Sequence, residues 1–156
     1  MNTVTSGDGT RIAYESLGNG PPLIVVDGAL CHRGMGPARA LARRLASHFA
    51  VTVYDRRGRG QSGDTLPWSL EHEVEDLGAL ITAVGGSANV FGVSSGAVLA
   101  LEAAARGLPV TRLVMYEPPF VVDDTRAPVA DDFVPGLHRL LAEGKRDEVV
   151  KRFMRM

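Results

Sequence analysis

Apolar and polar positions along the chain follow two periods, one typical of strands and one typical of helices. Strand alternation after the turn sequence Gly-Asp-Gly-Thr predicts a β-hairpin over residues 2–17. A continuous apolar run at 22–27 predicts a strand that is buried on both faces. Apolar runs at 49–55, 88–93 and 111–117 predict three more strands.

Between these runs, apolar residues recur at helical spacing. The pattern predicts helices over residues 37–48, 69–85 and 95–107. Strands that alternate with helices are typical of the α/β class, in which a mostly parallel sheet has helices on both faces. The alternation ends after the last predicted strand. Residues 118–135 are rich in Pro and Asp, and residues 135–156 are predicted to form two short amphipathic helices.

Length and composition narrow the class of protein. The 156 residues carry a formal net charge of −1 and one cysteine, Cys31. A chain of this length buries a core, and its charge indicates neither a nucleic-acid partner nor a membrane surface. One cysteine permits no intrachain disulfide, which fits a reducing compartment. The sequence has no signal-peptide pattern and no apolar run that would cross a bilayer, so we expect a cytoplasmic protein.

The segment Gly92-Val93-Ser94-Ser95-Gly96 joins a predicted strand to a predicted helix and fits the pattern G-x-S-x-G. A serine at so sharp a turn is held in an unfavourable backbone conformation that exposes its hydroxyl, and the flanking glycines permit close approach of the chain. The free N–H groups and dipole of the following helix would stabilise a negative oxygen on a substrate carbonyl. We therefore interpret Ser94 as a nucleophile and the Ser95 N–H as an oxyanion donor. The alternative is an ordinary serine N-cap.

With this pentad, the chain resembles the α/β-hydrolase superfamily over nearly all of residues 1–120. A second segment matches the D-x-R-G-x-G-x-S turn that these enzymes carry after their fourth strand. The matching residues are Asp55, Arg57, Gly58, Gly60 and Ser62. The resemblance implies a hydrolase core at residues 1–120 that is incomplete after strand six, followed by the start of a helical cap at residues 121–156.

A third segment, LIVVDGALC at residues 23–31, stands where the family has strand three followed by His-Gly. Asp27 replaces that histidine, and Gly28 is kept. In the family, the residue after this glycine donates the second oxyanion N–H, which implies that role for Ala29. Because the donor belongs to the backbone, the change to Asp27 need not abolish it. The residues expected to line the substrate pocket are Asp27, Gly28, Leu30, His32 and Glu117.

The glycine-rich stretch 58–63 also fits the dinucleotide-binding pattern G-x-G-x-x-G. That fingerprint must open directly into a helix, so that pyrophosphate lies on the helix N-terminus. Here Pro67 lies before the next predicted helix begins. We therefore expect no nucleotide, no other cofactor and no metal. The arginines of this turn are interpreted as turn-stabilising or solvated side chains; they are Arg56, Arg57 and Arg59.

A serine hydrolase needs a histidine base that is oriented by a carboxylate. In this superfamily, the acid and the histidine follow the nucleophile along the chain, after strands seven and eight. Only His138 follows Ser94, in the predicted cap, and Glu117 at the end of strand six is an alternative acid. The last predicted strand would also expose an apolar edge. We therefore expect a complementing C-terminal polypeptide or a homo-oligomer to complete the protein.

The expected reaction is hydrolysis of an ester, thioester or lactone through an acyl-enzyme on Ser94. Apolar residues of the predicted cap, such as Phe120 and Phe133, favour a small apolar substrate, although helix packing explains them equally well. Other members of the superfamily cleave C–C bonds or act as cofactor-free haloperoxidases, and the pentad does not distinguish these activities. The alternative outside catalysis is a small-molecule-binding protein without the chemistry, which Asp27 and the absent base favour.

Overall fold

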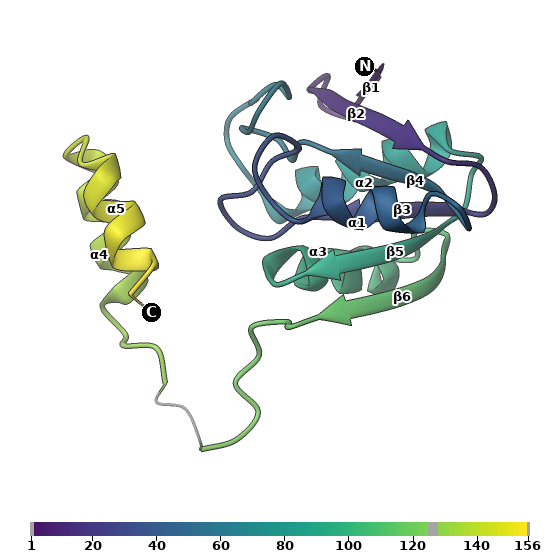
Figure 1. The fold of residues 1–156 in the computed structure, drawn as a ribbon. Helices are drawn as coiled ribbons and strands as arrows, with labels where there is room; N and C mark the ends of the chain where they lie inside the picture. Colours follow the sequence, from purple (N-terminus) through teal and green to yellow (C-terminus); the bar gives the residue numbers. More distant parts are fainter. Residues whose placement is uncertain (1, 125–127, 156) are drawn as a thin grey trace. The chain divides into compact units, whose positions relative to one another are not determined.

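A computed structural model describes residues 2–124 and 128–155. Its centre is a six-stranded sheet in the order β1-β2-β4-β3-β5-β6 (Figure 1). The β1–β2 and β2–β4 pairs are antiparallel, and the β4–β3, β3–β5 and β5–β6 pairs are parallel. The strands are β1 (Asn2–Thr5), β2 (Arg11–Leu17), β3 (Pro22–Val26), β4 (Ala50–Tyr54), β5 (Ala88–Val93) and β6 (Val110–Tyr116). The prediction of a mostly parallel α/β sheet is confirmed.

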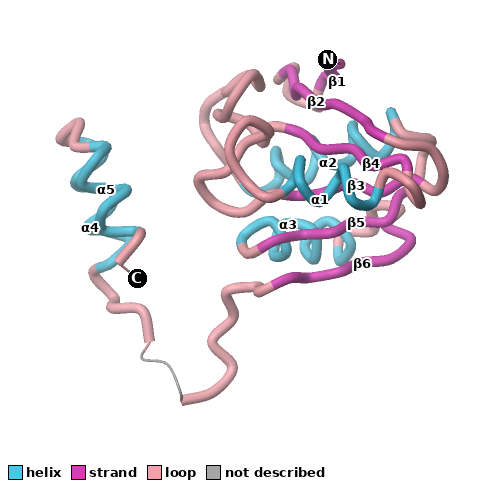
Figure 2. The backbone as a smooth tube through the Cα atoms, viewed as in Figure 1, coloured by secondary structure: helices cyan, strands magenta, loops and turns pink. Residues whose placement is uncertain are grey.

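Helices cover both faces of this sheet (Figure 2). One apolar core lies between the sheet and the helices α2 (Leu70–Ala83) and α3 (Ser95–Ala105). A second core lies on the opposite face, where α1 (Ala38–Leu45) contributes Ala38 and Ala42. The inner strands face both cores, which is why their sequences read as continuous apolar runs rather than as an alternation.

Local sequence signals place the ends of α2. The Ser69 hydroxyl accepts a hydrogen bond from the His72 N–H at 3.2 Å, and so caps the first turn of the helix. Glu71 and Glu73 lie in the first turn, where negative charge is favourable. At the other end, Gly85 and Gly86 both have positive φ, a conformation that stops a helix without a side-chain clash.

The strand β6 is the outer strand of the sheet on the β5 side. Its side chains are exposed to an unusual degree for an apolar strand: Val114 is 51% exposed and Tyr116 is 54% exposed. The inner strands β3 and β4 are almost entirely buried in comparison. An apolar strand with an open edge is a template for pairing with another strand.

Residues Phe120–Met156 form a second compact unit, separate from Met1–Pro119, and each is described by itself. In the described part of this second unit, α4 (Phe133–Ala142) and α5 (Arg146–Phe153) pack against each other. The Arg152 guanidinium lies 5.6 Å from the centre of the Phe133 ring, and Gly136 leaves room for it.

Among residues 2–124 and 128–155, every helix is too short or too polar to cross a membrane. The same residues contain no cluster of three or more His, Cys, Asp or Glu side chains that would hold a metal ion.

Candidate active site

Ser94 lies between the end of β5 and the first turn of α3, and its backbone is strained. Its φ of 52° and ψ of −121° fall in a region that favours glycine. Such a conformation costs about 1–3 kcal/mol at a residue with a side chain. The Ser94 N–H donates to the Tyr116 carbonyl at 2.9 Å, so β6 holds the turn from one side. The Ser94 side chain is half-buried.

The two glycines of the pentad lie where the chain passes closest to itself. A Cβ atom on Gly92 would lie 2.5 Å from the Ala97 Cα atom. A Cβ atom on Gly96 would collide with the Val26 carbonyl oxygen and would lie 2.6 Å from the Asp27 carbonyl oxygen. No side chain fits at either position, and this close approach brings the start of α3 against the end of β3.

The loop after β3 lies directly beside Ser94. A Cβ atom on Gly28 would be 3.2 Å from the Ser94 Cβ atom and 3.8 Å from its Oγ atom. Ala29 is half-buried, and Leu30, which is exposed, has a φ of 61°. Among the described residues, the Ala29 N–H donates to no other backbone group. The structure therefore brings together four residues predicted from the sequence: Gly28, Ala29, Ser94 and Ser95.

Arg56 connects both sides of this site. Its Nη1 atom donates to the Asp27 carbonyl at 3.2 Å and to the Ser95 hydroxyl at 3.1 Å. Its Nε and Nη2 atoms form a bidentate ion pair with the buried Glu73 carboxylate at 2.6 and 2.8 Å. Burial disfavours the charged form of Arg56 and lowers its pKa, but the hydrogen bonds to Glu73 and the charge of that carboxylate outweigh this effect. The pKa of the guanidinium is therefore raised.

The remaining polar residues of the turn after β4 hold the turn itself. Asp55 accepts from the Arg33 backbone N–H at 2.7 Å and from the Gln61 N–H at 2.9 Å. A Cβ atom on Gly60 would collide with the Asp55 carboxylate. The next helix, α2, begins only at Leu70. The stretch 58–63 therefore does not open into a helix, as a dinucleotide site requires.

Asp27 is 2% exposed, and neither of its carboxylate oxygens makes a hydrogen bond within normal limits. Burial raises its pKa to about 6, although the nearby Ala38 N–H and the charges of Arg59 and Arg56 oppose the shift. A Cβ atom on Gly36 would lie 3.2 Å from the Asp27 Oδ2 atom, so the carboxyl group faces the loop that leads to α1.

We expect Asp27→Asn to stabilise the protein in a pH-dependent manner. Because the folded state holds the Asp27 proton up to about pH 6, and the unfolded chain releases it near the ordinary value of 3.8, stability falls as pH rises through this interval. The Asp27→Asn variant has no carboxyl group at this position, so it does not lose stability by this ionisation. Its advantage in free energy of unfolding should grow between those pH values to at most about 3 kcal/mol. Urea unfolding of both proteins at a series of pH values measures the difference.

The matched control is Asp131→Asn, which changes an exposed aspartate of the second unit. It should alter the free energy of unfolding by less than about 0.5 kcal/mol at every pH. An Asp27→Asn variant whose difference from the wild type does not vary with pH would show that the carboxyl group is not buried as described.

His32 and Glu117 were predicted to line the substrate pocket. His32 makes its contacts within its own loop: its Nδ1 atom accepts from the Gly34 N–H at 3.1 Å. It lines an open hollow of about 320 Å³ that also includes Arg39 and Gln61. Glu117 is exposed, has a φ of 49°, and directly follows Tyr116, whose carbonyl binds the Ser94 N–H. The backbone thus places Glu117 directly after the residue that binds the strained serine.

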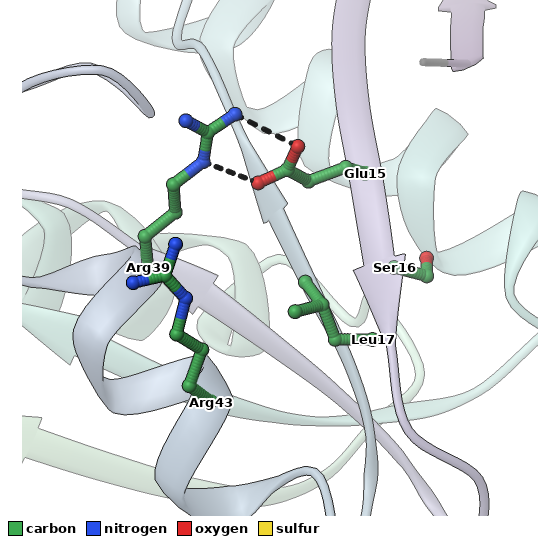
Figure 3. A pocket seen from close by; sticks show the side chains of 5 residues that line it. All are labelled: Glu15, Ser16, Leu17, Arg39 and Arg43. Atoms are coloured by element: carbon green, nitrogen blue, oxygen red, sulfur yellow. Dashed lines mark hydrogen bonds and ion pairs between the residues drawn. The ribbon is translucent and has the colours of Figure 1, made fainter.

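A further hollow, of about 240 Å³, lies between β2 and α1 (Figure 3). It is lined by Glu15, Ser16, Leu17, Arg39 and Arg43. The Arg39 guanidinium forms a bidentate ion pair with Glu15 (Figure 3). The hollow contains none of the residues beside Ser94, and the hydroxyl of its serine, Ser16, shares a hydrogen bond with the Thr52 hydroxyl at 2.8 Å.

Sequence reasoning missed the part that the arginines play at the site. The sequence pattern predicts turn-stabilising or solvated side chains for Arg56 and Arg59, and the structure shows that both donate to carbonyl groups of residues 27–31. A signal was present in the sequence. The turn follows β4, and β4 pairs in parallel with β3, so the carboxyl ends of both strands meet at one edge of the sheet.

A mostly parallel sheet with a strained serine at the crossing from β5 to α3 defines the class of α/β hydrolases. The profile described as "Alpha/beta hydrolase family" matches residues 27–155. The chain belongs to this family, as its sequence motifs predict.

Known relatives agree with this assignment. N-formylmaleamate deformylase of Pseudomonas putida is 37% identical over 122 residues, which are 73% of this chain and 44% of the relative. A pimeloyl-[acyl-carrier protein] methyl ester esterase of Methylococcus capsulatus is 37% identical over 58% of this chain and 34% of the relative. A crystal structure of an alpha/beta hydrolase from Sphaerobacter thermophilus is 57% identical, has a TM-score of 0.93, and matches 98% of this chain and 59% of that one. The chain thus spans about a third to three fifths of the length of these relatives.

Proposed function

We propose that the chain is the nucleophile-bearing part of a serine hydrolase that acts on an ester, thioester or lactone. Ser94 is the nucleophile, and the N–H groups of Ala29 and Ser95 form the oxyanion hole. The strained conformation of Ser94 carries this proposal, because such strain at a residue with a side chain is typical of functional sites. The names of the relatives, a deformylase and a methyl ester esterase, support hydrolysis.

The proposed reaction has two steps. The Ser94 Oγ atom bonds to the substrate carbonyl carbon and gives its proton to a base, and the alcohol or thiol leaves with that proton. Water then cleaves the acyl–Ser94 bond and releases the acid. In each step the carbonyl oxygen becomes negative beside the start of α3, where no side chain caps the helix and the helix dipole is positive. Preorganised donors of this kind supply a large part of the rate enhancement in acyl transfer.

We propose that the base and its orienting carboxylate come from a complementing C-terminal polypeptide, with a homo-oligomer as the other possible source. The exposed edge of β6 supports this, because Val114 and Tyr116 leave an apolar surface that a further strand would cover. The limited share of each relative that the chain spans supports it too. His138 on α4 and Glu117, directly after β6, are the candidates for base and acid within the chain.

A fluorophosphonate probe, which reacts with activated serines, tests the proposal on the complete protein. We expect the wild type to be labelled and Ser94→Ala to show no labelling. Ser87→Ala is the matched control, because Ser87 is exposed in the turn before β5, and it should be labelled like the wild type. A folded complete protein that is not labelled would contradict the proposal and support a binding protein that lacks the chemistry.

A further inference from the structure

Arg59 contacts the loop beside Ser94 in a way that the other arginines of its turn do not. Its Nη1 atom donates to the Gly28 carbonyl at 2.8 Å and, more weakly, to the Cys31 carbonyl at 3.4 Å. These two carbonyls lie at the beginning and end of the 28–31 loop. One guanidinium therefore spans the segment that contains Ala29.

The Gly28 carbonyl and the Ala29 N–H belong to the same peptide unit. The one cis peptide among the described residues is Leu66–Pro67, so the 28–29 peptide is trans. In a trans peptide, C=O and N–H point in opposite directions from a rigid plane. A donor that holds the Gly28 oxygen therefore turns the Ala29 N–H away from Arg59. Gly28 lies against the Ser94 side chain, so the peptide that carries this N–H begins at a residue in contact with the serine.

The loop needs such support, because its backbone is strained. Leu30 has a φ of 61°, which is unfavourable for a residue with a side chain. It is also exposed, so its own side chain offers little packing to hold the turn. The strain persists only where surrounding contacts hold it. The two hydrogen bonds from Arg59 are such contacts.

Arg59 differs from the other arginines of the turn in the partners of its charge. Arg56 is paired with Glu73, and Arg57 with Asp76 and Asp8. Among the described residues, Arg59 makes no ion pair, although it is half-buried. Partial burial of a cation that has no carboxylate partner costs free energy, because the charge loses part of its hydration. The Arg59 charge faces a peptide carbonyl instead. A charged donor on the carbonyl also polarises the peptide, which makes the N–H at its other end a stronger donor.

We propose that Arg59 is a positioning residue that aims and polarises the Ala29 N–H toward the oxyanion formed on Ser94. This inference rests on the proposed function. Arg59 does not touch the reacting atoms. Its effect reaches them through the Gly28–Ala29 peptide, and it is specific to the transition state, in which the carbonyl oxygen becomes negative.

The test compares Arg59→Met, Arg59→Lys and Arg39→Met in the complete protein, with p-nitrophenyl esters as substrates. Removal of one oxyanion donor costs about 10²- to 10³-fold in kcat. Loss of the Arg59 side chain leaves the Ala29 donor in place, so kcat should fall by a smaller factor. We expect Arg59→Met to lower kcat about ten- to hundred-fold and to change KM less than about threefold. Arg59→Lys keeps a charged donor and should recover most of this loss. Arg39→Met, which breaks the ion pair between Arg39 on α1 and Glu15 on β2, should leave kcat unchanged.

A second measurement separates positioning from folding. Trifluoromethyl ketones form a tetrahedral oxyanion on serine, and their affinity should fall in parallel with kcat in Arg59→Met. A variant with unchanged kcat, or with a loss that appears in KM alone, would overturn the inference while leaving the proposed function intact. If the wild-type protein neither turns over esters nor reacts with the fluorophosphonate, the proposed function fails, and this inference fails with it.

Discussion

Replacement of Ser94 by glycine should abolish acyl transfer and at the same time raise the free energy of unfolding. The nucleophile is removed, and kcat should fall at least about 10⁴-fold. Glycine adopts the φ of 52° and ψ of −121° without the strain that serine carries there. After subtraction of the entropy that glycine adds to the unfolded chain, we expect a gain of about 1 kcal/mol. Ester turnover and urea unfolding of the complete protein measure the two effects.

Ser94→Ala is the matched control, because alanine removes the hydroxyl but keeps a Cβ atom in the same strained conformation. It should be as inactive as Ser94→Gly without the gain in stability. If both variants unfold at the same urea concentration, the strain assigned to Ser94 is wrong. If Ser94→Gly keeps its activity, the nucleophile is another residue.

Arg57→Met should destabilise the folded core strongly, by about 3–5 kcal/mol. The Arg57 side chain is fully buried and binds both oxygens of Asp76, at 2.8 and 2.7 Å. It also donates to the His72 carbonyl at 3.1 Å and to Asp8 at 2.8 Å. It therefore joins the β1–β2 hairpin to α2, and its removal leaves the Asp76 carboxylate charged and unpaired in the interior. Urea unfolding of the complete protein gives the change in free energy.

Arg44→Met on the exposed side of α1 is the control for loss of an arginine, and it should change stability by less than about 0.5 kcal/mol. The double variant Arg57→Met/Asp76→Asn should be less destabilised than the sum of the single changes, because no charge then remains unpaired. A loss for Arg57→Met as small as that for Arg44→Met would contradict a structural role of this ion pair.

The order of strands and helices was predictable because apolar periodicity is a local property of the chain. The continuous runs of β3 and β4 reflect burial on both faces, which the structure shows for the consecutive residues Ile24 and Val25, whose side chains belong to opposite cores. The pentad predicted a strand-to-helix crossing, and β5 and α3 meet there. The family was also predictable, since its motifs lie in short contiguous segments, and the comparison with known proteins confirms it.

The contacts of charged side chains were not predictable in the same way. Arg56, Arg57 and Arg59 are nearly adjacent in the sequence, yet their main partners are respectively Glu73, Asp76 and a backbone carbonyl. Nothing in the local sequence pattern indicates which partner each of these three arginines binds. Each depends on which segment the fold brings opposite the turn, and these main partners lie 17 to 31 positions away in the sequence.

By itself, the amino-acid sequence determined the α/β class, the family and the position of the serine between β5 and α3. Those properties follow from residue type and spacing within single segments. Only the tertiary structure decided that the Asp27 carboxylate is buried and that Arg59 donates a hydrogen bond to the peptide beside Ser94. The physical reason is that the carboxyl ends of parallel strands converge at one sheet edge, so residues distant in sequence become neighbours only after the sheet has formed.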